Sequence, residues 1–441
     1  MRSSAASDVY KRQILVCAFT LLGIFTCRVS KTSNVYEENE NNQMKKQVNT
    51  ISMMLETEAG SGKYEMTTRD SWPTEGYVFN STLSKCENGG ELSWDDTNKK
   101  VLMSGNISDK CYVYFDIETK VFLADYVKSL YTGTQGDNNI YYHDSSLENG
   151  AGDNSYRYAG SSETTNNYVC FGSDADTCPE DNLYRIIGVF DGKVKLIKST
   201  GTTNTLLGTD GTYTSNSRSY AWTDLDSCPS TTAYKFDNNV VVLSNKNILG
   251  AVPDGGKGGG CNMWKYSNLN SVNLNTNFIT NLGIKWAALV DNATWKVSGY
   301  STANVTAKTM YTAEITNATK TYGPSDGTSK IGLMYASDYG FAASPSAWTT
   351  LLSSYNDSSI KSTNWIYNAG MEWTMTPYSS DSYSVFILSY VSTVSNTGNL
   401  GTWSSLGAAA GFGTRPAMYL NASVVYTRGS GTASDPIRIE I

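Results

Sequence analysis

The chain has 441 residues, of which 40% are hydrophobic and only 17% are charged, and its formal net charge is -7. This balance argues against a nucleic-acid-binding protein, because such a protein uses clustered lysine and arginine to displace counterions. The single histidine, His143, excludes any metal site built from several histidines. The polarity comes mainly from Ser, Thr, Asn, Gly and 30 tyrosines. We therefore expect a β-rich protein of two or three domains that is exported from the cytoplasm.

The N-terminal region predicts an export signal. Residues 1–13 (MRSSAASDVYKRQ) resemble the adapter-like ends of assembled environmental sequences, and we expect them to be a non-native leader. The apolar run 14–26 would span about 20 Å as a helix, less than the ~30 Å hydrocarbon core of a bilayer. We expect a signal or membrane-anchor segment over 14–30, followed by a polar linker over 31–47.

The same apolar run allows two other interpretations. The sequence AFTLL (18–22) resembles the start of a type IV prepilin, but Gly23 stands where a pilin has its glutamate. Cys27 could carry a lipid, although the Ile-Phe-Thr ahead of it lacks the usual small residue. The choice between a cleaved signal and a retained anchor stays open.

Six cysteines follow the leader region, and an even number in an exported chain predicts disulfides. Zinc is the competing interpretation, but it requires C-x-x-C knuckles or histidines. No two of these cysteines are closer than eight positions. Local proximity favours three pairs, although other pairings are allowed: Cys86 with Cys111, Cys170 with Cys178, and Cys228 with Cys261.

Residues 48–116 alternate short β-prone runs with turn sequences such as N-G-G (88–90), which predicts a small antiparallel β-sandwich-like domain. Two motifs in it, C-E-N-G-G-E-L-S-W-D and D-K-C-Y-V-Y-F-D, resemble a module near the N-terminus of surface proteins from Firmicutes-type gut bacteria. That family has no assigned activity.

A connector helix is expected over 117–133, because apolar residues recur at helical spacing and Gly133 ends the pattern. Strands are expected at 155–160, 167–172, 183–190 and 193–199, and a further helix at 269–290. These elements begin the large C-terminal domain, 134–441.

The last hundred residues carry four motifs in a fixed order: KIGLMYASDYG (330–340), NAGMEWTMTP (368–377), GTRPAMYL (413–420) and GSGTASDPIRI (429–439). They resemble C-terminal domains of bacterial surface proteins that end in Gly-x-Arg-Pro-x-x-x-Leu. Those domains are distantly similar to the C-type-lectin-like fold of lectins, formylglycine-generating enzymes and retroelement-diversified receptors. The resemblance implies a larger lectin-like α+β domain over 134–441.

Enzyme chemistry finds little support in the sequence. A formylglycine-generating enzyme needs a late cysteine pair, and no cysteine follows Cys261. His143 lies in a Tyr-Tyr-His-Asp loop without a nucleophile-elbow pattern, so we interpret it as a solvated or structural side chain. The glycine-rich loop 254–260 lacks the Lys-Ser/Thr step of a phosphate loop. We expect no catalytic residue and no cofactor.

The acidic loop around Cys178 could form a calcium site, because Ca²⁺ binds where several oxygen ligands converge. The alternative, which we favour, is a solvated acidic loop. The candidate ligands are Asp174, Asp176, Glu180 and Asp181.

Residues 378–412 combine tyrosine and tryptophan with Ser, Asn and Gly, a composition typical of adaptable recognition loops. A surface loop without a ligand is an equal alternative. Arg415 could bind a carboxylate, or instead cap nearby carbonyls at the entry to a strand. The resemblance implies that Trp373, in the Trp-Thr-Met-Thr-Pro segment, begins a core strand and packs in the core. The ligand-binding candidates are Tyr378, Tyr383, Tyr390, Asn396, Asn399, Trp403 and Arg415.

The leading hypothesis is an exported, membrane-anchored or secreted bacterial surface protein that binds a host or bacterial surface protein or a glycan. Its contact with the membrane would be made by the N-terminal segment. The alternatives are a pilin-like or envelope structural subunit and an enzyme with an unrecognised site.

Overall fold

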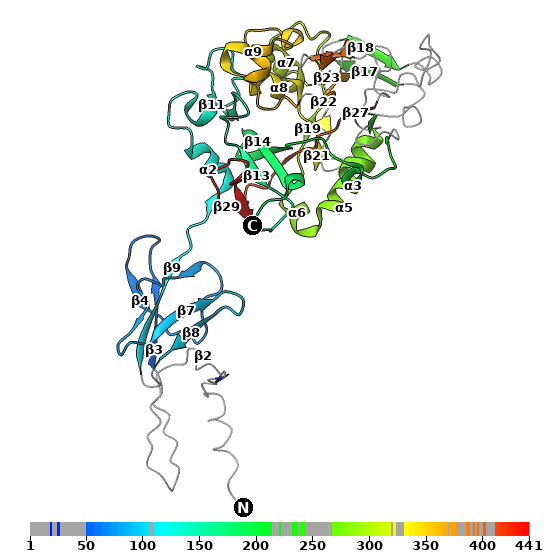
Figure 1. Cartoon of the computed structure of the whole chain (residues 1–441). Helices are drawn as coiled ribbons and strands as arrows, with labels where there is room; N and C mark the ends of the chain where they lie inside the picture. The colour runs from blue at the N-terminus through cyan, green and yellow to red at the C-terminus, as the bar shows by residue number, and fades with distance from the viewer. Residues whose placement is uncertain are drawn as a thin grey trace, which may run out of the picture. The chain divides into compact units, whose positions relative to one another are not determined.

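The computed structural model describes residues 50–105, 109–213, 267–318, 330–368, 370–377 and 411–440, together with isolated short strands and residue 264. The chain divides into two compact units, residues 1–120 and 121–441 (Figure 1). The structure is mixed α+β with more strand (31%) than helix (23%), which confirms the β-rich α+β class.

The first unit contains two sheets. One has the strand order β1-β2-β8-β7, and the other has the order β4-β3-β9-β5 with β6 also paired to β9. The strands from residue 50 onward are β3 (Thr50–Glu56), β4 (Tyr64–Met66), β5 (Tyr77–Phe79), β6 (Lys85–Cys86), β7 (Glu91–Asp95), β8 (Lys100–Ser104) and β9 (Lys110–Ile117).

One strand pair corrects the expected all-antiparallel arrangement. Strands β3 and β9 run parallel, in a register from Thr50↔Lys110 to Leu55↔Phe115. Alternation of apolar and polar residues predicts that a segment is a strand, but it carries no information on the direction of its partner. The sequence pattern therefore could not distinguish this parallel pair.

The core of the first unit follows from the alternation in β9. Cys111, Val113 and Phe115 are buried, while the tyrosines between them lie on the other face. Phe115 contacts the rings of Trp72 and Trp94 at centroid distances of 6.0 and 5.6 Å. Because β3, β5, β7, β8 and β9 all contribute to this hydrophobic cluster, it joins the two sheets.

Part of the predicted signal segment is described as strand. β1 (Ala18–Phe19) pairs with β2 (Ile24–Thr26), and β2 pairs with β8. Among the described residues, no helix has the length and apolar character required to cross a membrane.

The second unit begins with β10 (Val121–Phe122) and α2 (Leu123–Ser129), so the helix is shorter than the predicted connector. β10 pairs with β29 (Val425–Arg428), and Leu123, Ala124 and Val127 of α2 are buried in the core of this unit. The helix is therefore part of the second unit.

A seven-stranded antiparallel sheet organises the second unit, with the order β11-β12-β14-β15-β28-β21 and β13 paired to β14. Its strands are β11 (Ile140–His143), β12 (Ser155–Tyr158), β13 (Tyr168–Cys170), β14 (Leu183–Phe190), β15 (Lys193–Lys198), β21 (Ile331–Gly332) and β28 (Ala417–Tyr419). Late residues therefore pair with early ones at its centre, since β28 lies beside β15.

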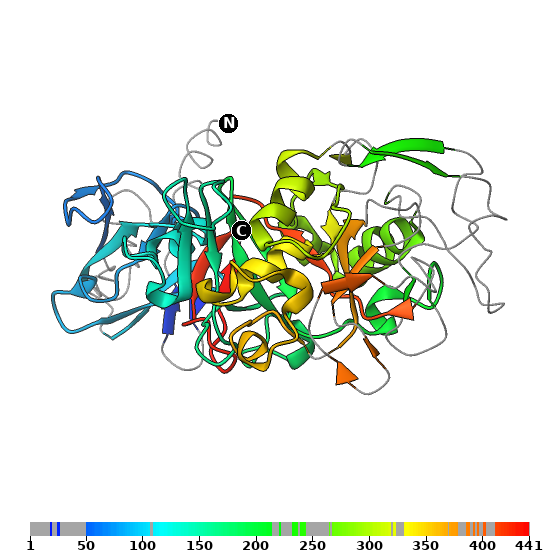
Figure 2. The same cartoon turned by 90° about the horizontal axis from the view of Figure 1, so that it is seen from above.

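Helical segments surround this sheet in two groups that Figures 1 and 2 both keep apart. The green group is α3 (Asn204–Leu207), the π-helical η4 (Leu269–Phe278) and α5 (Ile279–Leu282); the yellow group is α7 (Ala307–Tyr311), α8 (Ala336–Ala342) and α9 (Ser358–Ser362). The predicted helix over 269–290 is interrupted at Gly283, whose φ is +83°, before α6 (Ile284–Leu289).

Smaller sheets complete the unit. β30 (Arg438–Glu440) pairs with β29, and β22 (Glu372–Pro377) pairs with β23 (Val385–Leu388), which pairs with β26 (Leu400–Thr402). The two-stranded pairs are β16 (Tyr220–Ala221) with β27 (Gly411–Phe412), β17 (Thr232–Phe236) with β18 (Asn239–Leu243), β19 (Trp295–Lys296) with β20 (Thr321–Tyr322), and β24 (Val391–Ser392) with β25 (Ser395–Asn396).

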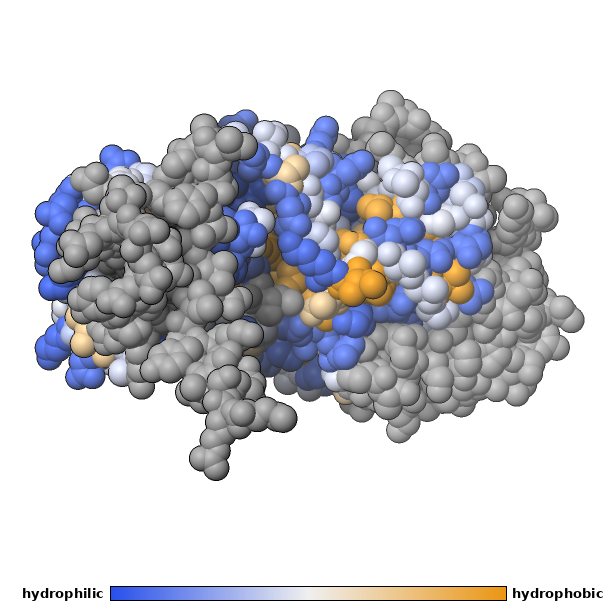
Figure 3. All heavy atoms as spheres, turned by 90° about the horizontal axis from the view of Figure 1, so that it is seen from below, coloured by the Kyte–Doolittle hydropathy of each residue, from blue (hydrophilic) through white to orange (hydrophobic). Residues whose placement is uncertain are grey.

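The described surface in Figure 3 is mainly hydrophilic, with hydrophobic residues gathered in a few small patches. Ile284, 92% exposed, is the most exposed large apolar residue among those described. Most described apolar side chains therefore lie inside the two units.

Two disulfides are formed in the described part of the chain: Cys86 bonds Cys111 across β6 and β9, and Cys170 bonds Cys178. Both pairings are those that local proximity predicts. Cys228 and Cys261 lie outside the described residues.

Replacement of both Cys86 and Cys111 by alanine should lower the free energy of unfolding of the first unit by about 3 kcal/mol, because the bridge closes a loop with a sequence separation of 25. Hydrogen exchange of β9 peptides, measured by mass spectrometry, reports this loss. The matched variant Cys170→Ala/Cys178→Ala should leave exchange in β9 unchanged. Unaltered β9 protection in the first variant would contradict the prediction.

Candidate functional site

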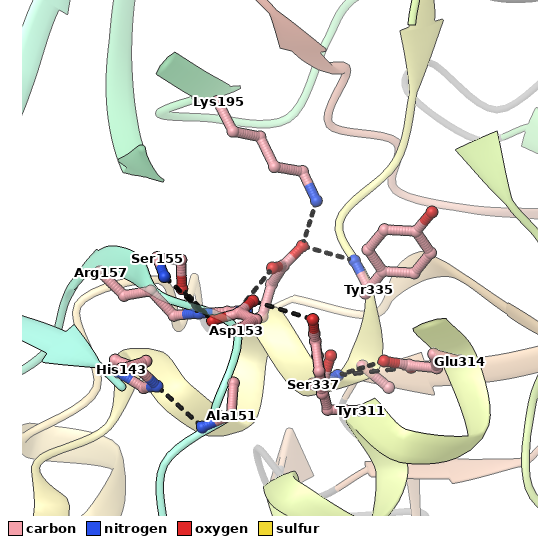
Figure 4. A network of polar contacts seen from close by, with 12 residues as sticks. His143, Ala151, Asp153, Ser155, Arg157, Lys195, Tyr311, Glu314, Tyr335 and Ser337 are labelled. Carbon is pink, nitrogen blue, oxygen red and sulfur yellow. Dashed lines mark hydrogen bonds and ion pairs between the residues drawn. The ribbon is translucent and has the colours of Figure 1, made fainter. Parts of the chain in front are cut away.

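A cluster of buried charged side chains lies between the central sheet and α8, and Figure 4 shows it from close by. Lys195 of β15 bonds Asp338 of α8, with 2.6 Å between Nζ and Oδ2. Arg157 of β12 lies on the other oxygen, with 3.6 Å between Nη1 and Oδ1. All three side chains are at most 2% exposed. One carboxylate thus joins two cations from two strands.

The same carboxylate also holds the start of α8. Asp338 Oδ2 accepts the backbone N–H of Tyr335 at 2.9 Å, which satisfies one of the donors left free at a helix N-terminus. The helix is short, and its position is tied to the sheet through this ion pair.

A second carboxylate completes the surroundings of Arg157. Asp153 Oδ2 lies 2.6 Å from Arg157 Nη2 and accepts the Tyr311 hydroxyl at 2.9 Å, while its Oδ1 accepts the Ser155 hydroxyl at 2.5 Å. Burial by itself would raise the pKa of Asp153. The Arg157 cation and the two hydroxyl donors outweigh burial and hold that pKa well below its ordinary value.

Aromatic rings replace water around the two cations. The guanidinium of Arg157 lies 4.6 Å from the centroid of Phe190 and 5.0 Å from that of Phe341. Lys195 Nζ lies 4.4 Å from the ring of Tyr335. Cation–π attraction of this kind offsets part of the desolvation cost of each cation.

Glu314 is the third carboxylate of the cluster. It is fully buried on η5 (Thr312–Thr316), and it accepts hydrogen bonds from the Ser337 backbone N–H and from the Thr376 hydroxyl. No ion pair with a cation is formed by Glu314 among the described residues. Burial raises its pKa to about 7, although both hydrogen bonds oppose the rise.

His143 lies close to this cluster and is completely buried. Its Nδ1 accepts the backbone N–H of Ala151 at 3.0 Å, and its ring packs against Phe341 and Trp348. Burial, together with the nearby Arg157 cation, holds its pKa well below the ordinary value, so the ring is neutral. The side chain is structural and not solvated.

A second buried ion pair involves Arg415, which was expected among the ligand-binding residues. Its Nε lies 2.8 Å from Glu372 Oε2, and its Nη2 donates to the carbonyl of Ile366 at 2.7 Å. At 3% exposure the guanidinium is not presented to solvent. Arg415 therefore caps internal groups and holds β22, in agreement with the alternative interpretation of its motif.

This ion pair belongs to an anchor at the base of residues 378–410. Trp373 N–H donates to the carbonyl of Gly413 at 3.0 Å, and its ring packs edge-on against Phe412 at 4.7 Å. The Trp373 indole N–H donates to the carbonyl of Tyr220 at 2.7 Å. Because Tyr220 also pairs with Phe412, the strands on both sides of residues 378–410, β22 and β27, meet β16 here.

Most of the residues predicted to bind a ligand cannot be compared with the structure. Tyr378, Tyr383, Tyr390, Asn399 and Trp403 lie outside the described residues, and only the backbone of Asn396, in β25, is described. The prediction for these six residues stays a prediction.

The acidic residues around Cys178, which were considered as calcium ligands, lie in separate surroundings. Asp174 pairs with Lys285 at 2.6 Å, and Asp181 lies 3.6 Å from Lys198. The backbone carbonyl of Asp176 accepts from Arg438, and Glu180 is exposed at the start of a 3₁₀ turn. In the described part of the chain, only Cys86, Asp109 and Cys111 bring three such ligand atoms together, and the two cysteines are disulfide-bonded.

The sequence did not predict the buried cluster. Arg157 and Lys195 are buried within their strands, but in the sequence each alternates with more apolar residues, a pattern that predicts a solvent-facing position. A buried charge of this kind requires a partner. That partner is 143 residues away from Lys195, and no local pattern identifies it.

No protein-family model matches the chain, and neither a curated protein nor a solved structure matches it. The resemblance to lectin-like surface domains therefore stays a prediction.

The pKa of Glu314 predicts how stability changes with pH. Between the ordinary pKa of 4.5 and about 7, the folded protein keeps a proton that the unfolded chain releases. Stability should therefore fall as pH rises through this window, by about 3 kcal/mol, and then level off.

The variant Glu314→Gln should remove this fall, which urea denaturation of the second unit at a series of pH values would measure. Glu148→Gln, at an exposed position, is the matched control and should retain the wild-type profile. A Glu314→Gln profile as steep as that of the wild type would contradict the assignment.

Asp338→Ala should destabilise the second unit by about 3–5 kcal/mol, because it leaves two buried cations without their shared carboxylate. The control is Asp125→Ala, which removes an exposed pair with Lys128 and should cost less than about 1 kcal/mol. Denaturant unfolding of both variants gives the comparison. Similar losses in the two would show that the buried cluster is not held by Asp338.

Proposed function

We propose that the protein is an exported bacterial surface protein that binds a protein or glycan through its second unit, without catalysis. In this proposal the first unit is sandwich-like and the second is C-type-lectin-like. The N-terminal segment attaches the protein to the cell, or directs its secretion. The two disulfides are compatible with an extracellular location.

The observation that carries this proposal is the anchor formed by Glu372, Trp373, Phe412 and Arg415. Residues 378–410 leave β22 and return at β27, and both ends are fixed by a buried ion pair, an aromatic contact and backbone hydrogen bonds. Binding sites are often carried by loops that a rigid scaffold positions. The Tyr, Ser, Asn and Gly content of this segment fits such a role.

The buried cluster is the feature that would favour an enzyme, since Glu314 has a pKa near neutral pH. Its charged groups are, however, turned toward one another. Arg157, Lys195, Glu314 and Asp338 are almost completely buried, so a substrate could reach them only if the fold opened. We therefore interpret the cluster as a support for the central sheet and α8.

A glycan and host-protein array probed with residues 48–441, with and without Ca²⁺, tests the proposal. We expect specific binding that falls at least about tenfold in Tyr390→Ala and Trp403→Ala, because truncation of an aromatic hot spot costs about 2 kcal/mol or more. Phe122→Ala, at an exposed aromatic outside the segment, is the control and should bind as wild type. Unchanged binding in both segment variants would overturn the site assignment.

A further inference from the structure

The first unit connects the N-terminal segment to the second unit through a particular pair of strands. After β1 and β2, which lie at the edge of the other sheet where β2 pairs with β8, the chain re-enters the unit at Thr50, the first residue of β3, and leaves the paired strands after Ile117, the last residue of β9. Because β3 and β9 are parallel and adjacent, these two points lie at opposite ends of the same ladder, as Figure 1 shows.

This geometry determines how the unit responds to tension along the chain. Pulling on Thr50 and on the end of β9 in opposite directions slides the two strands past each other. All the hydrogen bonds of the six-residue register then carry the force together and must break almost at once. If the strands were pulled apart from one end, the bonds would break one after another at lower force.

Buried carboxylates reinforce both ends of this ladder. At the exit end, Glu56 of β3 accepts the backbone N–H of Ile117 at 2.9 Å and that of Gly62 at 3.0 Å. At the entry end, the Thr50 N–H donates to the carbonyl of Asp109 at 3.1 Å. The Asp109 carboxylate accepts N–H groups of Asn88 and Gly90. Hydrogen bonds outside the β3–β9 ladder therefore add to the attachment at each of its ends.

The core protects the ladder from water. Met53 of β3 and Val113 and Phe115 of β9 are completely buried between the two sheets. Water cannot easily replace a backbone hydrogen bond that is covered in this way, so the bonds resist rupture cooperatively.

The disulfide limits how far the unit can extend. Cys111, near the start of β9, is bonded to Cys86 of β6. If β9 separated from β3 under tension, force would pass through the sulfur atoms, and residues 87–110 would remain outside the stretched path.

We propose that the first unit is a force-bearing connector, in which the parallel β3–β9 pair resists tension between the N-terminal segment and the second unit. This inference rests on the proposed function, because tension arises only if one part is held by the cell and the other by a ligand. In this proposal the tension comes from a bound surface that moves relative to the cell.

Single-molecule force spectroscopy on the full chain tests the proposal by changing only the direction of pulling. Handles attached at Thr50 and Lys120 load β3 and β9 in shear. Handles at Glu58 and Lys120 pull on neighbouring ends of the same two strands and peel them apart. All three positions are exposed, so the core is unaltered in both experiments. We expect a several-fold higher unfolding force in shear, and equal forces in the two geometries would overturn the proposal.

The length released on unfolding is an independent measurement. Reduction of the disulfide should lengthen the shear unfolding step by about 90 Å, from the 25-residue separation at about 3.6 Å per residue. An unchanged step would show that the bridge does not shield residues 87–110. Neither measurement uses a ligand, so an absence of array binding would contradict the proposed function and leave the force result intact.

Discussion

The second unit depends on the requirement that a charge removed from water must be compensated. Asp338 meets this requirement for two cations at once, because Lys195 and Arg157 approach its two oxygens from neighbouring regions of one sheet. The contact also fixes where α8 begins. Moving the helix away from the sheet would separate Asp338 from Lys195 and leave Arg157 with Asp153 as its ion-pair partner. The cluster therefore couples the position of the helix to the register of the strands.

The second ion pair has the same character but a different location. Arg415 and Glu372 join the strand before residues 378–410 to the strand after them, and Trp373 adds an aromatic contact at the same place. A long insertion imposes little strain on the fold when its two ends are already held together by the core. The unit can therefore carry a long polar and aromatic segment without disturbing the sheet below it.

In the first unit, hydrogen bonds and a covalent bond hold strand β9 in place. The parallel partner strand β3, the buried Glu56 and Asp109 carboxylates, and the disulfide all act on β9, through which the chain leaves the unit. The two units thus use buried polar groups in two ways. In the second unit they position secondary structure, and in the first they secure the strand that joins the units.

Local patterns in the sequence determined the β-rich α+β class, most strands of the central sheet and two disulfide pairings. Each of these depends on the spacing of neighbouring residues, since strand and helix periodicity extends over only a few positions. Tertiary structure decided the parallel direction of β3 and β9, the partners of Arg157 and Lys195, and the internal role of Arg415. These depend on which distant segments become neighbours, because the carboxylate that pairs with Lys195 is 143 residues away in the sequence.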